Sequence, residues 1–294
     1  MTMNEINGVQ LLEYMSWCMI FSGILAFVVL QFVNIPYGRQ ASSAFGFPVN
    51  VKLAWFVQEI PSLAVPAVFI ILGTPATRFS QPSNQILIAM FLTHYVQREM
   101  DPSPNPSRIS SCIPTKKKKK CGTLSSHWDT GCRALIYPFL IRGGKATPFI
   151  PFILAFIFCM YNGYLQGRYL SQYGIYPEDW ITDPRFIVGF VLWLAGLLLN
   201  LHSDHVLRTL RKPGEMGYKI PRGGMFEYVS GANFLGEIIE WTGFAVACWS
   251  LQSAAFAVFT FLILSTRAKQ HHKWYLQKFE DYPKSRKILV PFLY

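Results

Sequence analysis

The sequence predicts an all-α membrane protein in which seven transmembrane helices carry the chain back and forth across the bilayer. Charged residues make up 15% of the chain and hydrophobic residues 51%, whereas soluble domains carry about 25% charged residues. Seven apolar stretches are candidates for helical spans, which need roughly 20 residues, and several of them are marginal in length. They are residues 11–33, 53–72, 85–95, 147–170, 186–201, 229–247 and 250–265.

The basic residues predict how this bundle is oriented. An odd number of spans places the two chain ends on opposite sides of the membrane. Outside residues 99–133, the side of the N-terminus holds only Arg78, Arg168 and Arg185, and all other Lys and Arg residues fall on the opposite side. Cytoplasmic loops carry the excess of basic residues in membrane proteins. We therefore expect a lumenal N-terminus and a cytosolic C-terminus, which also accounts for the net charge of +11 without nucleic acid.

Residues 99–133 differ in composition from the rest of the chain. They are rich in Pro, Ser and Lys and include an unbroken Lys run over residues 116–120. Such a segment buries too little apolar surface to fold, so we expect a disordered insert in a single helical domain formed by residues 1–98 and 134–294. The Lys run indicates a solvated loop or, alternatively, a lipid-surface patch. The Cys residues and His127 lack a paired zinc spacing, so no metal site is expected.

Two polar side chains interrupt the second and third stretches. Glu59 lies in the middle of the second, and an ionisable residue inside a span indicates a functional site. A carboxylic acid that stays neutral in apolar surroundings can donate a hydrogen bond to a carbonyl oxygen. Tyr95, near the end of the third stretch, is a second candidate donor. The alternatives are a polar contact between helices for Glu59 and an interfacial aromatic role for Tyr95.

Three polar stripes at helical spacing lie at the end of the fifth stretch, within the sixth and just after the seventh. The first comprises Asn200, Asp204, Arg208 and Arg211, the second Asn233, Glu237 and Glu240, and the third Arg267, His271 and Tyr275. Cations beside amides and carboxylates suit a phosphate-bearing cofactor, because guanidinium groups bind phosphate through paired hydrogen bonds. Each stripe alone is equally compatible with a solvated helix face, but three together predict a shared pocket. The sequence has no GxGxxG motif after a strand, which excludes a Rossmann site.

Several segments are specific enough to indicate a family. They read WFVQEIPSLAVPA over residues 55–67, LTHYVQR over 92–98, LIYPFLIRGGK over 135–145 and NGYLQGRYL over 162–170, followed by a near-continuous run over 179–294. On these segments the chain resembles the steroid 5α-reductase family, and most of all its type 1 branch. The likeness covers the chain except for the extreme N-terminus and residues 99–133.

The resemblance implies a seven-helix oxidoreductase of the endoplasmic reticulum membrane. Its expected reaction is hydride transfer from NADPH to C5 of a 3-oxo-Δ4-steroid such as testosterone or progesterone, with the steroid arriving from the lipid phase. Glu59 and Tyr95 match the family residues that bind and polarise the C3 carbonyl. The first four helices are expected on the steroid side, and the last three helices with the 200–228 loop on the NADPH side.

The family's cofactor-binding residues fall largely on the three stripes. They match Arg98, Arg185, Asn200, Asp204, Arg211, Tyr218, Asn233, Glu237, Arg267, His271 and Tyr275. The 35-residue insert departs from the family pattern, and Arg98 and Arg133 both fit the junction that it creates. Three other classes stay open: a membrane enoyl-CoA reductase, a prenylcysteine-type methyltransferase that uses S-adenosylmethionine, and a receptor or channel without enzymatic activity.

Overall fold

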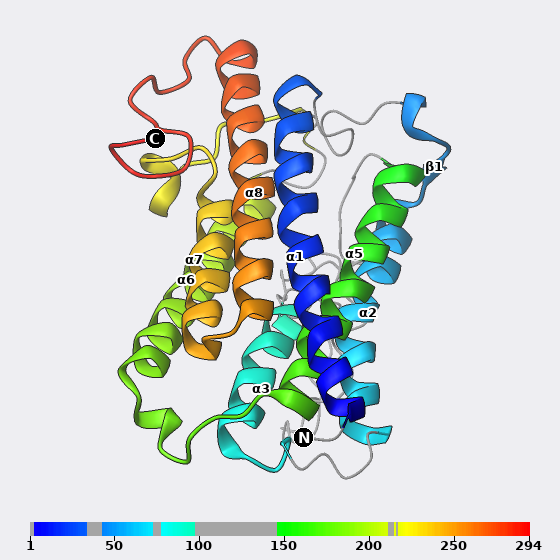
Figure 1. Ribbon diagram of the computed structural model, residues 1–294. Coiled ribbons are helices and arrows are strands. Elements are labelled where there is room, and N and C mark those ends of the chain that lie inside the picture. Colours follow the sequence, from blue (N-terminus) through cyan, green and yellow to red (C-terminus); the bar gives the residue numbers. More distant parts are fainter. Residues whose placement is uncertain (1–2, 34–42, 73–77, 98–145, 211–214, 216) are drawn as a thin grey trace, which may run out of the picture.

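The computed structural model describes residues 3–33, 43–72, 78–97, 146–210, 215 and 217–294. Within these residues the chain forms seven long α-helices (Figure 1). They are α1 (Met3–Phe32), α2 (Val51–Leu72), α3 (Pro82–Gln97), α5 (Phe149–Arg168), α6 (Pro184–Thr209), α7 (Ala232–Cys248) and α8 (Leu251–Lys278). The shorter elements are the antiparallel strands β1 (Pro48–Val49) and β2 (Thr147–Pro148), the π-helical turn η4 (Tyr169–Tyr173), and the 3-10 turns η2 (Ser43–Phe45), η5 (Trp180–Thr182) and η6 (Gly224–Glu227).

These helices confirm the predominantly helical class, and five of them have the length and apolar composition of membrane spans. The five are Ile6–Phe32, Leu53–Ile71, Phe149–Tyr173, Pro184–Thr209 and Leu251–Lys278. α3 and α7 lie where the sequence predicts the third and sixth spans, but they have only 16 and 17 residues. A full crossing takes roughly 20 residues. The number of spans and the orientation of the chain ends therefore stay predictions.

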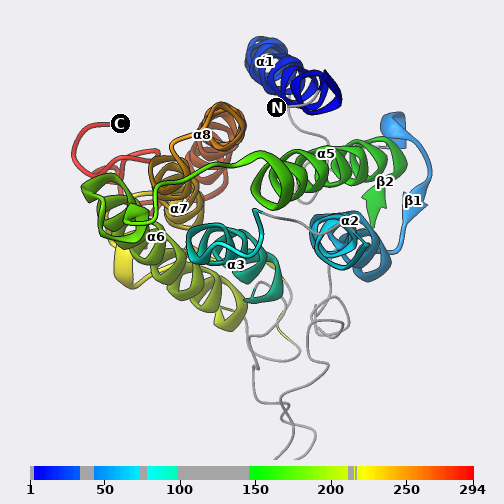
Figure 2. The ribbon, with the colours of Figure 1, turned by 60° about the horizontal axis from the view of Figure 1, so that its bottom comes forward.

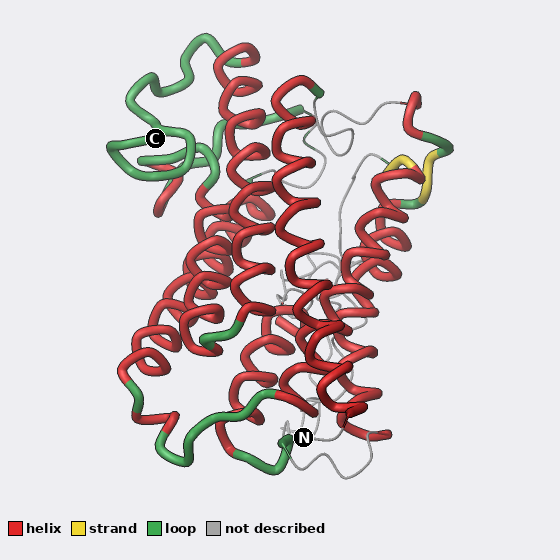
Figure 3. The backbone as a smooth tube through the Cα atoms, in the orientation of Figure 1, coloured by secondary structure: helices red, strands yellow, loops and turns green. Residues whose placement is uncertain are grey.

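The bundle has two parts that meet at α3. Figure 2 shows α3 between the α2–α5 pair and the group formed by α6, α7 and α8. α1 lies on the outside and packs mainly along α8. Figure 3 shows the two chain ends at opposite ends of the bundle. Because α3 touches both parts, residues on its two sides can connect a site in one part with a site in the other.

The α2–α5 pair packs backbone against backbone. Pro61 lies inside α2, where a proline removes one helical hydrogen bond. Opposite it on α5 is Gly163, where a Cβ atom would lie 2.8 Å from the Pro61 carbonyl oxygen. This close approach lets the Ser62 hydroxyl of α2 donate a hydrogen bond of 3.4 Å to the Cys159 carbonyl oxygen of α5.

The α6–α7 pair is held even more closely by glycines on both helices. On each helix two of them lie seven residues apart: Gly189 and Gly196 on α6, Gly236 and Gly243 on α7. A Cβ atom at Gly236 would lie 2.5 Å from the backbone nitrogen of Asn200, and one at Gly196 would lie 2.2 Å from that of Glu240. Small residues at such spacing allow helix backbones to touch within a membrane. The polar stripes of α6 and α7 are therefore brought to the same place.

α8 also fixes the end of α1. The Gln270 side-chain amide donates hydrogen bonds of 3.2 and 3.3 Å to the carbonyl oxygens of Leu30 and Val33. Carbonyl groups at the end of a helix have no partner within it, so Gln270 supplies one. Most of the large apolar side chains of α1 are otherwise exposed, which suits a helix surrounded by lipid.

The C-terminal segment folds back over the loop that precedes α7. The Ser230 backbone N–H donates to the Lys287 carbonyl oxygen at 2.9 Å. The Arg286 side chain is buried, and it donates to the Pro221 carbonyl oxygen at 2.8 Å and to Glu227 Oε2 at 3.3 Å. Arg286 therefore anchors this loop at the end of the bundle that carries the C-terminus.

Candidate active site

Glu59 of α2 and Tyr95 of α3 both lie in the interior of the bundle. Both side chains are buried. Glu59, Ser62 of α2 and Asn162 of α5 lie near enough to the Tyr95 hydroxyl to influence it. Three helices therefore supply one polar cluster in apolar surroundings. Its acid and phenol groups are suited to hold a carbonyl oxygen.

A buried hydrogen-bonded pair connects this cluster to α7. His94 directly precedes Tyr95, and its Nδ1 atom lies 2.9 Å from Glu240 Oε1. The His94 ring also packs 4.6 Å from the ring of Trp241. The sequence assigns Glu240 to the cofactor stripe of α7, but the structure turns it toward α3 instead. The sequence analysis missed this pair, although a histidine inside an apolar stretch is the signal that would have identified it.

One turn earlier on α7, Glu237 faces α6. The Asn200 side-chain amide donates to the Asn233 carbonyl oxygen at 3.0 Å and to Glu237 Oε1 at 3.4 Å. Asn200 and Glu237 are both buried. The absence of a side chain at Gly236 makes room for this contact. The structure thus brings together three of the predicted cofactor residues.

The stripe on α8 runs beside the same turn of α7. The Arg267 guanidinium lies 4.8 Å from the centre of the Phe234 ring, and the His271 ring lies 5.2 Å from it. Tyr275, one turn further, is buried and stacks on Tyr282 with 5.1 Å between ring centres. Arg267 and His271 therefore gather at the N-terminal turn of α7, whereas Tyr275 packs toward the C-terminal segment.

The remaining predicted residues lie around or outside this group. Asp204 is half-buried on α6, one turn beyond Asn200. Tyr218 is exposed, and its ring meets that of Trp274 of α8 edge-on at 4.9 Å. Arg98, Arg211, Arg133 and the insert over residues 99–133 lie outside the described residues, so their roles stay predictions.

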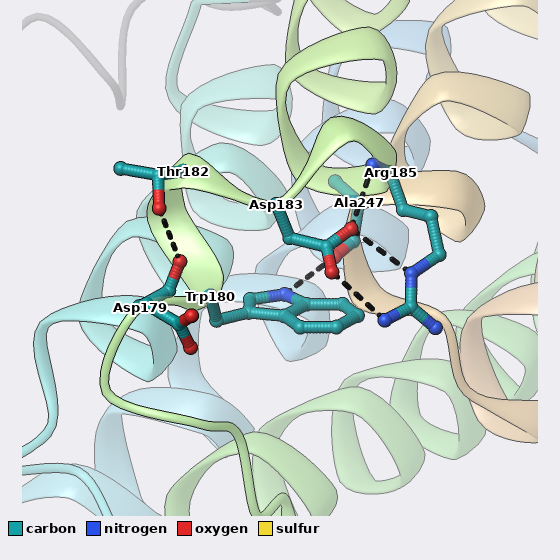
Figure 4. Close-up of polar contacts among 6 residues, drawn as sticks. All are labelled: Asp179, Trp180, Thr182, Asp183, Arg185 and Ala247. Carbon is teal, nitrogen blue, oxygen red and sulfur yellow. Dashed lines mark hydrogen bonds and ion pairs between the residues drawn. The ribbon is translucent and has the colours of Figure 1, made fainter.

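Arg185 lies beside Asp183 and Trp180 at the start of α6 (Figure 4). It lies in the first turn of α6 and donates two hydrogen bonds of 2.9 Å to the Asp183 carboxylate. Its guanidinium lies 4.5 Å from the Trp180 ring and 5.2 Å from the Trp249 ring. Hydrogen bonds from Arg185 lower the pKa of the Asp183 carboxyl below its ordinary value. A helix rise of 1.5 Å per residue separates Arg185 from Asn200 by about 22 Å, so this charged pair anchors the start of α6.

α5 carries two further buried side-chain amides, those of Asn162 and Gln166. The Gln166 side-chain amide of α5 donates to Asn162 Oδ1 at 3.2 Å and to the Gln252 carbonyl oxygen of α8 at 2.9 Å. Asn162 and Gln166 are fully buried. Neither is among the predicted site residues, although two amides four residues apart within an apolar span form a recognisable signal.

The chemistry of the α6–α8 group fits a phosphate-bearing dinucleotide. Arg267 and His271 offer donors for phosphate oxygens, and the carboxylates of Asp204 and Glu237 offer acceptors for ribose hydroxyls. Next to them, the buried Ser203 hydroxyl has no hydrogen-bond partner among the described residues, which leaves a donor for a ligand. Within the part of the chain that the structure describes, no three His, Cys, Asp or Glu residues gather in a way that would hold a metal ion.

An apolar helical bundle with a buried acid and a buried tyrosine, and a second polar group on α6, α7 and α8, is typical of a membrane oxidoreductase. Comparison with known proteins gives the family. Residues 145–294 match the family described as 3-oxo-5-alpha-steroid 4-dehydrogenase. The chain belongs to this family, and it is an oxidoreductase of steroid metabolism.

The relatives of this chain include both types of the enzyme. It is 52% identical to 3-oxo-5-alpha-steroid 4-dehydrogenase 1 of Bos taurus over 284 residues, which cover 96% of this chain and 97% of the other. It is 48% identical to the type 1 protein of Homo sapiens over 285 residues, which cover 97% and 96%. The identity to the human type 2 protein is 44% over 243 residues, which cover 83% and 81%. The chain is therefore more similar to these type 1 relatives than to the type 2 relative.

Proposed function

We propose that the chain reduces the 4,5 double bond of 3-oxo-Δ4-steroids such as testosterone and progesterone, with NADPH as the hydride donor. The observation that carries this proposal is the buried cluster of Glu59 and Tyr95. Through His94 and Glu240 it adjoins α7, which also bears Glu237 of the predicted cofactor group. The family to which the chain belongs supports steroid 5α reduction.

In this reaction Glu59 and Tyr95 donate hydrogen bonds to the C3 carbonyl oxygen of the steroid. They stabilise the negative charge that develops on this oxygen, as an oxyanion hole does. The bound nicotinamide supplies the hydride that C5 receives. C4 takes a proton from Tyr95 or from water, which completes the addition of two hydrogens across the double bond.

The other predicted residues bind and orient the dinucleotide, except Arg185, which is bound to Asp183. Its hydroxyl and amide groups are hydrogen-bonded by Asn200, Asp204, Asn233 and Glu237. Its phosphates are bound by Arg267, His271, Tyr218, Tyr275, Arg98 and Arg211. The proposed orientation puts this end of the bundle on the cytosolic side of the endoplasmic reticulum membrane, where NADPH is available. The steroid reaches the helices that carry Glu59 and Tyr95 from the lipid phase, because an apolar ligand partitions into lipid.

The proposal is tested by NADPH oxidation in detergent-solubilised protein. Testosterone and an enoyl-CoA are compared as substrates, each with the full chain and with a chain that lacks residues 99–133. We expect testosterone-dependent oxidation and none with the enoyl-CoA. Absence of steroid-dependent oxidation in both forms would defeat the proposal, and oxidation with the enoyl-CoA alone would favour the acyl thioester reductase.

Glu59→Gln separates the substrate site from the cofactor site. The amide keeps the shape of the side chain but loses the acid group, so kcat/KM for testosterone should fall about 100-fold or more. The Kd for NADPH, measured by fluorescence titration, should stay within about two-fold. An equal loss of steroid turnover and NADPH affinity would mean that Glu59 does not act on the steroid.

A further inference from the structure

Asn162 lies near Tyr95, and its side-chain NH₂ group is an unpaired hydrogen-bond donor among the described residues. Its side chain is 0% exposed, and among the described residues none accepts a hydrogen bond of normal geometry from its Nδ2 atom. Buried polar groups are nearly always satisfied in native structures, so an exception calls for an explanation. The Tyr95 hydroxyl lies within interaction range of this amide.

Gln166 determines which end of Asn162 faces Tyr95. Its side-chain amide donates to Asn162 Oδ1 at 3.2 Å, and it also donates to the Gln252 carbonyl oxygen of α8 at 2.9 Å. The second bond holds Gln166 in place. Because Oδ1 of Asn162 accepts from Gln166, its NH₂ group is the end of the amide that is available to donate to Tyr95.

Ser62 reaches the same hydroxyl from α2. The Ser62 hydroxyl donates a hydrogen bond of 3.4 Å to the Cys159 carbonyl oxygen. This distance is long for a hydroxyl hydrogen bond. Ser62 is fully buried and lies near the Tyr95 hydroxyl. Its hydroxyl can therefore turn from the weak bond to the Tyr95 oxygen when negative charge builds up there.

We propose that Asn162 and Ser62 are positioning residues that direct the Tyr95 proton toward the steroid carbonyl group, with Gln166 orienting Asn162. Donors aimed at the Tyr95 oxygen occupy its lone pairs, so its O–H group points away from α5. The same donors stabilise the charge that Tyr95 acquires as it shares or gives up its proton. They therefore act more on the transition state than on ground-state binding. This inference rests on the proposed function and adds residues outside the acid–tyrosine pair.

The test replaces the donor by an apolar group of similar size. Asn162→Leu is measured in the full chain in lipid nanodiscs with NADPH and testosterone. We expect kcat to fall about 10- to 100-fold, whereas the KM for NADPH stays within about two-fold. A loss of NADPH affinity as large as the loss of kcat would indicate a merely structural role and would overturn the inference.

Asn84→Leu is the matched control. Asn84 is also fully buried, but it lies at the other end of α3 and donates to the carbonyl oxygens of Leu170 and Gly174 at 2.7 and 3.0 Å. Its loss should lower thermal stability and leave the kcat of the folded protein unchanged. Ser62→Ala is a second, smaller test, with an expected fall in kcat of about 3- to 10-fold, and it decides the question if Asn162→Leu does not fold.

A spectroscopic readout separates the inference from the proposed function. The ultraviolet absorbance of a bound enone shifts to longer wavelength as hydrogen bonding to its carbonyl oxygen strengthens, so this shift should be smaller in Asn162→Leu. If the unsubstituted chain reduces testosterone, and the folded variants match it in kcat and in absorbance shift, only the inference is overturned. If the unsubstituted chain neither binds nor reduces a 3-oxo-Δ4-steroid, the proposed function fails and the inference fails with it.

Discussion

His94 and Glu240 form a contact in which replacing either side chain alone lowers the stability of the protein. Both are almost completely buried, with exposed side-chain fractions of 2% and 0%. His94→Leu leaves the Glu240 carboxyl group buried without the partner at Oε1. Breaking a buried pair in this way typically costs about 3 kcal/mol, and we expect a loss of that size in the free energy of unfolding, measured by thermal denaturation in nanodiscs.

The second half of the pair provides the control. Adding Glu240→Gln to His94→Leu removes the buried acid, so part of the lost stability should return. Glu240→Gln alone should cost less than His94→Leu, because the amide oxygen can still accept from His94 Nδ1. A double variant that is less stable than either single variant would contradict this account of the pair.

At the scale of the element, the α6–α7 pair depends on glycines that have no room for a side chain. A Cβ atom at Gly236 would meet the backbone nitrogen of Asn200 at 2.5 Å. Gly236→Ala should therefore separate the helices and lower stability by about 2 kcal/mol, and it should weaken NADPH binding because it displaces Asn200. Thr242→Val, at an exposed site on α7, is the control and should behave like the unsubstituted chain in both thermal denaturation and NADPH titration.

The loop before α7 should respond to acid. The Gly223 N–H and then the Arg286 guanidinium lower the pKa of the Glu227 carboxyl below its ordinary value of 4.5. A lowered folded-state pKa stabilises the protein above the unfolded-state value, and this contribution is lost as the pH falls through the folded-state value. Glu227 is partly exposed, so the effect is small: Glu227→Gln should lower the Tm by roughly 1–3 °C near neutral pH. This difference should shrink as the pH falls below 4.5, and a difference that stays unchanged in strong acid would contradict the assignment.

Periodicity predicts which residues share a helix face, and this explains what the sequence could and could not reveal. Asn200, Asn233 and Glu237 were predicted to converge because polar residues at helical spacing inside apolar stretches must turn toward protein rather than lipid. The partner of Glu240 did not follow from spacing, because it depends on which helix lies opposite each face. The same holds for Asn162, whose relation to Tyr95 arises only when α5 and α3 are brought together.

Arg185 illustrates the opposite case. Arg185 matches the family's cofactor residues by its position in the sequence. Its place in the fold follows from its contacts with the neighbouring residue Asp183. Asp183 accepts the backbone N–H of Arg185 at the first turn of α6 as well as its side chain, and helix starts commonly carry such acidic caps. The sequence contains that capping signal, which accounts for the contacts that Arg185 makes in the structure.

At the scale of the whole molecule, the orientation in the membrane can be tested directly. The chain has no Asn-x-Ser/Thr acceptor site with x other than Pro, so a glycosylation site added at either end would be read without background. Basic residues gather on the side of the C-terminus, and basic loops stay in the cytoplasm. We expect a site added at the N-terminus to be glycosylated in microsomes and one added at the C-terminus to stay unmodified. Glycosylation at the C-terminus alone would show that the topology is the opposite of the predicted one.

The direct contact between the backbones of α6 and α7 has a genetic consequence. A clash between two side chains can be relieved by making the partner smaller, so a damaging substitution there has second-site suppressors. A Cβ atom at Gly196 or Gly236 would instead meet main-chain atoms, which no substitution in the partner helix can remove. A suppressor screen that starts from either position should therefore return true revertants or changes that stabilise the protein elsewhere, and no compensating change on the facing helix.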